Sequence, residues 1–263
     1  MAVVAIIPAR FGSTRLPGKV LLAETGRPLI QHVYESVRSS RRIDRLAVAT
    51  DSPQVAQAVR AFGGEVVLTG SACRTGTDRL AEAAEKMRLP DGDIVVNVQG
   101  DEPDMPGQCV DKVVQMLENS DAQIATLATP ITPQEADRLS LTKVVIGRDG
   151  RALYFSRARI PHDRDGEGRC TYYLHHGIYA YRASFLKVYA ALPSTPAEQA
   201  EKLEQLRALE HGYRIIVGVV GYRGARIDTP EEYAAFVTRM KAGGGTGQSP
   251  APAGNPPGER NVR

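Results

Sequence analysis

Short apolar runs recur through the first hundred residues, with helix-like segments between them. The runs are rich in β-branched residues and continuous rather than alternating, and they span residues 3–8, 45–50, 65–69 and 93–99. Continuous apolar character is typical of strands covered on both faces, as in a parallel sheet. Segments 28–40 and 53–64 repeat apolar residues at helical spacing and each opens with a proline, the second after two candidate N-cap residues, Asp51 and Ser52. This alternation predicts an α/β fold with right-handed crossovers.

The pattern changes after a further strand expected at 123–131. Residues 143–157 place a polar Arg-Asp-Gly turn between two strand-like runs, which predicts a hairpin. Another strand is expected at 175–182, followed by helices at 183–192 and 200–212, the second of them ended by Gly212. We therefore expect residues 143–182 to form an antiparallel excursion from a mostly parallel wound sheet.

The end of the chain divides into an ordered part and a tail. An apolar strand is expected at 214–221 and a last helix at 228–241. Residues 242–263 are mainly glycine, proline and small polar residues, with too little apolar surface to offset the entropy of ordering, so we expect a disordered tail. A chain of 263 residues with 42% hydrophobic content can bury one large core, and we expect a single domain over 1–241.

Composition narrows the possible functions. No apolar run is long enough to cross a bilayer, and the N-terminus enters a strand pattern without the charged start of a secretory signal, so we expect a cytoplasmic protein without a membrane partner. Cys73, Cys109 and Cys170 are far apart and odd in number, which supports neither a disulfide framework nor a thiolate metal site. A net charge of +3 is too small to predict nucleic-acid binding.

Basic residues gather in the loop after the first expected strand. Arg10, Arg15 and Lys19 lie there with Gly12 and Gly18. In an open parallel sheet, ligands bind beyond the carboxyl ends of the strands. Glycines let backbone N–H groups approach an anion, and the basic side chains add charge-assisted donors. The loop therefore indicates a phosphate site, with a solvated basic turn as the alternative.

Two familiar phosphate motifs do not match this loop. Five residues separate Gly12 from Gly18 instead of the four of a P-loop, and Val20 stands where a Mg²⁺-binding Ser or Thr should follow the lysine. The loop has no Gly-x-Gly-x-x-Gly pattern either. A P-loop ATPase and a Rossmann dehydrogenase are both disfavoured.

Acidic residues follow the strand expected at 93–98. Gln99, Asp101 and Glu102 come at the same edge of the sheet as the basic loop. A carboxylate beside bound phosphates is repulsive unless a cation lies between them, and Mg²⁺ prefers few protein carboxylates together with phosphate oxygens and water. The alternative is that Asp101 starts an acidic turn or caps a helix near 106–118.

A second carboxylate precedes the last helix. Thr229, Pro230 and Glu232 form an N-cap, a first-turn proline and a capping-box partner, so the helix start does not need Asp228. Asp228 is then available as a second Mg²⁺ ligand, although an ordinary solvated aspartate fits the sequence equally well.

Seven segments, in this order, resemble the 3-deoxy-manno-octulosonate cytidylyltransferases, the CMP-Kdo synthetases. They are "IPARFGSTRLPGK", "TGTDRLAEAAE", "VNVQGDEP", "ALYFSR", "HHGIYAYR", "LEQLR" and "DTPEEY", and the resemblance covers residues 1–241. It implies a three-layer, Rossmann-like nucleotidyltransferase fold. It also implies transfer of CMP from CTP to the C2 hydroxyl of 3-deoxy-manno-octulosonate (Kdo), with release of pyrophosphate, for lipopolysaccharide biosynthesis. A homodimer, with contacts from residues 143–182, follows from the same resemblance.

The resemblance also implies roles for individual residues. The residues with catalytic roles would be Lys19, Arg10, Asp101 and Asp228. The last two would bind Mg²⁺. The CTP site would comprise Arg10, Ser13, Lys19, Thr75, Gly76, Thr77, Arg79, Gln99 and Asp101. The Kdo site would comprise Gln99, Arg157, His175, Tyr179, Glu204 and Gln205.

Several alternatives remain open at this point. The same machinery could transfer CMP to an 8-amino Kdo analogue or a nonulosonic acid, and a non-catalytic nucleotide sensor could use the same cleft. Tyr179 could simply pack, and Glu204 and Gln205 could lie on an exposed helix face. His175 and His176 are adjacent, so on a strand they face opposite ways. His162 stands where the family often has an aromatic residue, and the loop 162–174 is short, which leaves the lid over the sugar unassigned.

Overall fold

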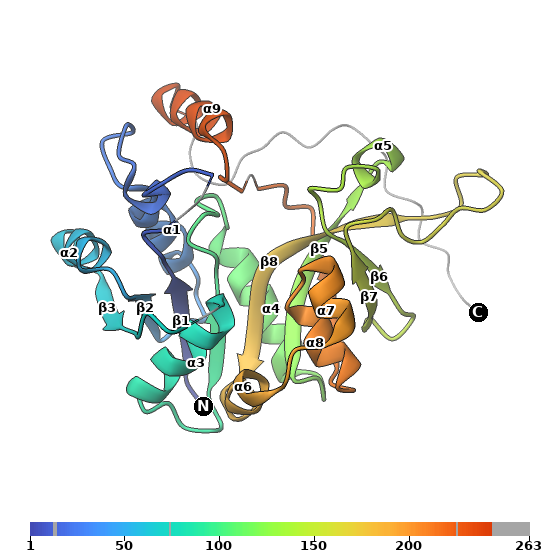
Figure 1. Cartoon of the computed structure of the whole chain (residues 1–263), viewed down its shortest axis with the longest axis horizontal. Coiled ribbons are helices and arrows are strands. Elements are labelled where there is room, and N and C mark those ends of the chain that lie inside the picture. The colour runs from blue at the N-terminus through green and yellow to red at the C-terminus, as the bar shows by residue number, and fades with distance from the viewer. Residues whose placement is uncertain (13–14, 74, 225, 244–263) are drawn as a thin grey trace.

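The computed structural model describes residues 1–12, 15–73, 75–224 and 226–243, and these residues form one mixed sheet between layers of helices (Figure 1). The main strand order is β3-β2-β1-β4-β8-β5-β9, and β6 joins the sheet beside β8 and pairs with β7. The strands are β1 (Val3–Pro8), β2 (Arg45–Thr50), β3 (Glu65–Leu68), β4 (Ile94–Asn97), β5 (Ile124–Ile131), β6 (Lys143–Ile146), β7 (Ala152–Ser156), β8 (Tyr172–Arg182) and β9 (Ile215–Val219).

Helices cover both faces of this sheet. The 3₁₀ helix and the α-helices are η1 (Lys19–Leu21), α1 (Leu29–Arg38), α2 (Pro53–Ala61), α3 (Gly76–Lys86), α4 (Gly107–Glu118), α5 (Pro133–Ala136), α6 (Ala183–Ala191), α7 (Pro196–Glu201), α8 (Gln205–Glu210) and α9 (Pro230–Lys241). Apolar side chains of α1, α2 and α4 share one core cluster with one face of the sheet, and those of α3, α6 and α8 share a second cluster with the other. The predicted three-layer, mostly parallel α/β fold is confirmed.

Most of the helix N-caps predicted from the sequence are present in the structure. Ser52 is the N-cap of α2, and its hydroxyl accepts a hydrogen bond from the N–H of Val55. Thr229 and Glu232 form the capping box of α9. Pro28 is the N-cap of α1 rather than its first residue. Helix α9 packs against α1 through a small apolar cluster, and this contact places the segment before α9 beside the first loop.

The antiparallel part of the fold differs from the expectation. Residues 143–156 form the predicted hairpin of β6 and β7. Strand β8, however, lies in the middle of the sheet, antiparallel to both β4 and β5 (Figure 1). It is therefore part of the central sheet and not of an excursion. Strand order depends on pairing between segments far apart in sequence, which the local pattern of residues 172–182 does not encode.

The single helix expected at 200–212 is two short helices. A capping box of Thr195 and Glu198 starts α7 earlier, and Lys202, with φ of 55°, ends it in the left-handed region. Helix α8 then begins at Gln205, and Gly212, with φ of 78°, follows its end as predicted. The break between α7 and α8 places residues 202–205 on the wall of the cavity described below.

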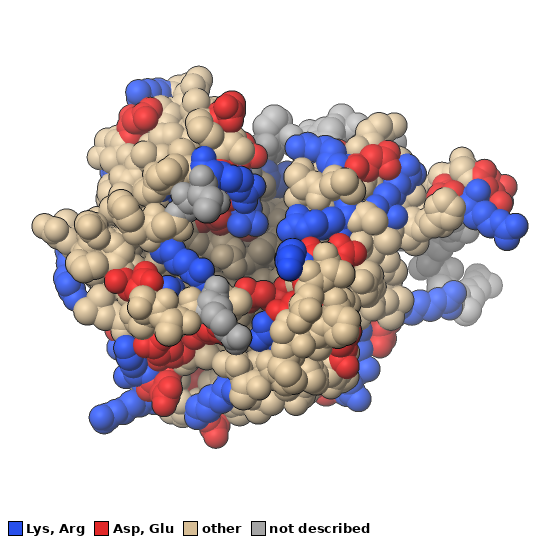
Figure 2. Space-filling model, viewed as in Figure 1, with Lys and Arg blue, Asp and Glu red and all other residues tan. Residues whose placement is uncertain are grey.

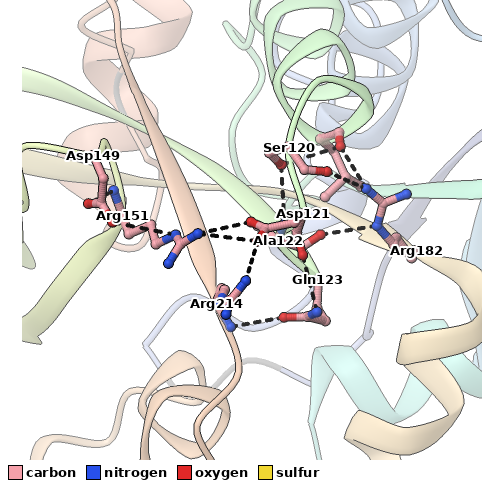
Figure 3. Close-up of polar contacts among 9 residues, drawn as sticks. Ser120, Asp121, Ala122, Gln123, Asp149, Arg151, Arg182 and Arg214 are labelled. Carbon is pink, nitrogen blue, oxygen red and sulfur yellow. Dashed lines mark hydrogen bonds and ion pairs between the residues drawn. The ribbon is translucent and has the colours of Figure 1, made fainter.

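The amino edge of the sheet is held by a cluster of arginines (Figure 3). Arg182, the last residue of β8, donates to the carbonyls of Leu117, Ser120 and Ala122 at 3.0, 2.7 and 3.1 Å. Asp121 accepts from both Arg151 and Arg214. The two ion pairs of Asp121 are exposed and contribute on the order of 0–1 kcal/mol each. Together with the hydrogen bonds of Arg182 they join α4, β5, β7, β8 and β9 at this edge of the sheet. Within the described residues, none of the helices has the length and apolar character needed to cross a membrane.

Candidate active site

A cavity of about 820 Å³ opens at the carboxyl edge of β1 and β4. Figure 2 shows a hollow near the middle of this face, with Lys and Arg side chains on several sides of it. This is the edge at which an open parallel sheet binds ligands, and the volume suits a small molecule. The expected site residues that line the cavity are Gly76, Thr77, Gln99, Arg157, His175, Tyr179, Glu204, Gln205 and Asp228.

Lys19 joins the two carboxylates proposed as metal ligands. Its Nζ lies 2.6 Å from Oδ2 of Asp101 and 2.9 Å from Oδ1 of Asp228, and it donates to the carbonyl of Ile227 at 3.0 Å. Gly18 precedes Lys19 with φ of 65°, and its N–H donates to the carbonyl of Phe11, so the loop folds back on itself before Lys19. The loop after β1, the loop after β4 and the segment before α9 therefore meet at one point. The sequence predicted this meeting from their positions at one edge of the sheet.

Two arginines add to the positive charge at this point. Arg226 Nε lies 3.1 Å from Oδ2 of Asp101 and 3.2 Å from Oδ2 of Asp228, and Arg15 lies 2.9 Å from the same oxygen of Asp228. Burial raises the pKa of Asp228, but the hydrogen bond from Lys19 and the charge of Arg226 outweigh burial and lower the pKa overall. The sequence did not predict a role for Arg226. Its only indication is that it is basic and lies two positions before Asp228.

The chemistry of the two carboxylates is compatible with a magnesium site. Oδ1 of Asp101 is buried and has no hydrogen-bond partner, so its lone pairs are available. Asp228 and Asp101 are already close enough to share one ammonium group. No cluster of three or more His, Cys, Asp or Glu side chains that could hold a metal occurs within the described ranges. Two carboxylates without a third protein ligand suit Mg²⁺, which takes one or two protein carboxylates and completes its shell with phosphate and water.

Glu102 is a second buried carboxyl beside this pair. It lines the cavity, and burial together with the charge of Asp101 raises its pKa to about 7. A Cβ on Gly177 would lie 2.6 Å from Oε1 of Glu102 and 3.1 Å from Cγ of Gln99. Only glycine at 177 allows β8 to pass this close to the loop after β4. The sequence placed Glu102 at this edge but gave no sign of its burial.

The start of α3 forms the opposite wall. Thr75 caps the helix by accepting from the N–H of Asp78, and the hydroxyl of Thr77 donates to Glu204 at 2.7 Å. Gly76 and Thr77 line the cavity together with Asn97, whose Oδ1 is buried without a hydrogen-bond partner. Asn97 was not among the expected residues, although its place at the end of β4 was a signal.

Five of the residues expected at the CTP site are not among those that line the cavity, namely Arg10, Lys19, Thr75, Arg79 and Asp101. Arg79 is fully buried and pairs with Asp51 and Thr69, at the ends of β2 and β3, because the turn of α3 directs it that way. It joins α3 to the ends of β2 and β3. Arg10 is exposed in the first loop. Ser13 lies outside the described residues.

The wall assigned to the sugar is formed by β8, β7 and α8. His175 accepts from or donates to the hydroxyl of Thr126 at 3.0 Å and packs edge-on against Phe155, whereas His176 contacts Thr129 and Tyr222. Both rings border the cavity, because the regular pairing of β8 with β5 is interrupted between His175 and Tyr179 and His176 lies within this irregularity. Burial lowers their pKa values to about 3 and about 4. Both therefore act as neutral hydrogen-bonding groups near pH 7.

Tyr179, Glu204 and Gln205 have defined surroundings. Tyr179 packs between His175 and Tyr181 and borders the cavity, so packing and exposure to a ligand are combined in one side chain. Burial raises the pKa of Glu204, whose carboxylate accepts from Thr77. Gln205 is buried at the first turn of α8. Glu204 and Gln205 face the cavity rather than an exposed helix surface.

Comparison with known proteins identifies the family. A cytidylyltransferase family model matches residues 4–215. A 3-deoxy-manno-octulosonate cytidylyltransferase of Anaeromyxobacter sp. (strain Fw109-5) is 51% identical over 92% of this chain and 98% of its own, and one from Desulfatibacillum aliphaticivorans is 45% identical over 92% and 99%. The chain belongs to the 3-deoxy-manno-octulosonate cytidylyltransferase family.

Solved structures agree with this membership. A CMP:2-keto-3-deoxy-manno-octonic acid synthetase, complexed with CTP, superposes with a TM-score of 0.88 at 42% identity and covers 92% of this chain and 100% of its own. A 4-diphosphocytidyl-2C-methyl-D-erythritol synthase superposes with a TM-score of 0.62 at 14% identity, over 90% of this chain and 97% of its own. The second likeness concerns the fold alone.

Proposed function

We infer that this protein transfers CMP from CTP to the anomeric C2 hydroxyl of Kdo and releases pyrophosphate. The observation that carries this conclusion is the meeting of Lys19, Asp101 and Asp228 at the rim of a cavity whose other wall holds Arg157 and His175. Relatives about half identical over nearly their whole length bear the corresponding name, and a related synthetase has been solved with CTP. The product enters lipopolysaccharide biosynthesis.

The first loop acts on the triphosphate. Lys19, the first residue of η1, is a point charge that can stabilise the negative charge that grows on the departing pyrophosphate. Arg15 and Arg226 reach the same place and can bind phosphate oxygens once CTP is present. The side chain of Arg10 is exposed in the same loop and can add a further donor to the phosphates. The reaction itself requires in-line attack by the sugar hydroxyl on the α-phosphorus.

We propose that Asp101 and Asp228 hold Mg²⁺. The support is the free, buried Oδ1 of Asp101 and the close approach of Asp228. When bound there, Mg²⁺ reduces the repulsion between two anionic substrates and makes the attacking hydroxyl easier to deprotonate. The chain's own contribution is to keep Asp228 ionised, since Lys19 and Arg226 lower the pKa of Asp228 against the effect of its burial.

The far wall orients the acid sugar. Arg157 offers a planar fork that matches a carboxylate, and neutral His175, Tyr179 and Gln205 can donate to sugar hydroxyls. Glu204 and Gln99 supply acceptors. These side chains keep the C2 hydroxyl directed toward the phosphate side of the cavity.

Turnover with a panel of keto sugar acids tests the substrate. CTP is supplied with Kdo, with an 8-amino Kdo analogue and with a nonulosonic acid, and pyrophosphate release is measured for each. We expect the highest kcat/KM with Kdo. Activity with the nonulosonic acid and none with Kdo would reject the assignment, and no pyrophosphate with any acid would indicate a nucleotide sensor.

We also propose that the protein is a cytoplasmic homodimer. Strand β7 pairs only with β6 in the described sheet, and Leu153 and Tyr154 on it are exposed. An exposed apolar edge of this kind favours association with another chain. Light scattering at micromolar concentration is expected to give twice the mass of 28.5 kDa. A monomer under these conditions, or a dimer that survives Leu153→Glu, would contradict this interface.

A further inference from the structure

Lys143, the first residue of β6, is fully buried without a carboxylate partner among the described residues. Its Nζ donates to the carbonyl oxygens of Arg138, Leu141 and Arg157. Three acceptors use all three protons of an ammonium group, whereas a neutral amine would offer only two N–H donors. Burial of the charge is costly and lowers the pKa of Lys143. A methionine would fill the same space without that cost, so packing alone does not account for a lysine here.

The three carbonyls belong to two segments of the cavity wall. Ser140, Leu141, Thr142 and Arg138 line the cavity on one segment, and Arg157, just after β7, lines it on the other. Both segments are irregular chain outside the sheet, so no ladder of hydrogen bonds fixes them. The ammonium group of Lys143 joins them to each other from behind the wall.

Glu201 holds Arg157 from the opposite side. Its Oε2 accepts from the N–H of Arg157 at 2.9 Å, and its carbonyl accepts from Nε of the same arginine at 3.1 Å. The hydroxyl of Ser156 also donates to Glu201. The main-chain N–H of Arg157 therefore donates to the side chain of Glu201, and its C=O accepts from the side chain of Lys143.

This arrangement leaves the guanidinium fork free. Nε of Arg157 is engaged by Glu201, and none of the hydrogen bonds within the described residues uses its two terminal nitrogens. The side chain borders the cavity and is half-buried. A guanidinium with Nε fixed and both terminal nitrogens free is prepared for a bidentate bond to a planar anion.

We propose that Lys143 and Glu201 are positioning residues that fix Arg157 for the carboxylate of the sugar acid. This inference rests on the proposed function, because it assigns that carboxylate to Arg157. The two charged groups act only through Arg157 and its wall, on the sugar side of the cavity. They therefore set the selectivity for an acidic acceptor and leave the binding of CTP unchanged.

Steady-state kinetics of Lys143→Met test the proposal. We expect KM for Kdo to rise about tenfold or more, since a misplaced binding group costs rate and affinity steeply, while KM for CTP stays within about twofold of wild type. Preference for Kdo over its C1 carboxamide is expected to fall by a similar factor. Lys187→Met is the control, because Lys187 pairs with the exposed Asp91 and neither residue lines the cavity; it should change neither constant.

Two further variants keep the test decisive. Glu201→Met removes the acceptor of the Arg157 N–H at a half-buried position and leaves Lys143 in place, so it tests the same wall independently; we expect the same selective rise in KM for Kdo. Adding Lys143→Met to Arg157→Met should change KM for Kdo no further, because Lys143 acts through Arg157. An equal rise in both KM values, or a lower Tm with both unchanged, would show a structural role only and overturn the proposal. Wild-type enzyme that does not use Kdo would instead overturn the proposed function.

Discussion

Asp101→Asn and Asp228→Asn are each expected to lower kcat by about 10²- to 10³-fold, the usual effect of removing one preorganised charged group from a reacting centre. Asparagine keeps the shape and one oxygen of the carboxylate but removes its charge. The two carboxylates now share Lys19 and face the phosphate side of the cavity, so either change leaves a divalent cation with a weaker site. Binding of CTP is expected to persist in part, because the basic loop is unchanged.

Pyrophosphate release at saturating substrate measures the turnover of these variants, and calorimetry with CTP measures binding. Asp121→Asn is the control, since Asp121 also pairs with two cations, Arg151 and Arg214, but at the far edge of the sheet (Figure 3). It should retain turnover. If Asp101→Asn and Asp228→Asn both turn over at the wild-type rate, the carboxylates have no role in the reaction.

Lys19→Met is expected to lower kcat by about 10²- to 10³-fold because the charge that stabilises the leaving pyrophosphate is lost. The same change removes the ammonium group from between Asp101 and Asp228, so added Mg²⁺ should bind the variant more tightly in the absence of nucleotide. Ligand binding to the folded state raises Tm. We therefore expect Mg²⁺ to raise the Tm of Lys19→Met by more than it raises that of the wild type.

Pyrophosphate release and thermal unfolding with and without Mg²⁺ measure the two effects. Lys86→Met provides a close control, since Lys86 also holds one carboxylate, of Glu82, and one carbonyl, of Leu68, on the outer face of α3. It should change neither quantity. If the kcat of Lys19→Met is undiminished, Lys19 has no role in the chemistry.

Local signals in the sequence predicted most of the fold. Continuous apolar runs marked β1, β2 and β4, and the caps at Ser52 and Thr229 fixed two helix starts. The position of β8 was not predictable in this way, because its neighbours β4 and β5 are determined by pairing over long sequence distances. The break at Lys202 was missed because only its left-handed backbone, and no residue type, marks it.

The same division holds for the site. Lys19, Asp101 and Asp228 could be predicted together because each follows or precedes an element that ends at one edge of the sheet. Arg79 could not be placed, since the phase of α3 decides whether it faces the cavity or the sheet. Lys143 gave no signal at all, because a lysine in a strand suggests an exposed position and its burial depends on three carbonyls of other segments.

A crystal structure with CTP and Mn²⁺, with the metal located by its anomalous scattering, tests the central claim most directly. We expect a metal peak bound by both Asp101 and Asp228, with the triphosphate on Lys19 and its arginine neighbours. A metal peak elsewhere, no peak between these carboxylates, or a triphosphate outside the reach of Lys19 would contradict the account.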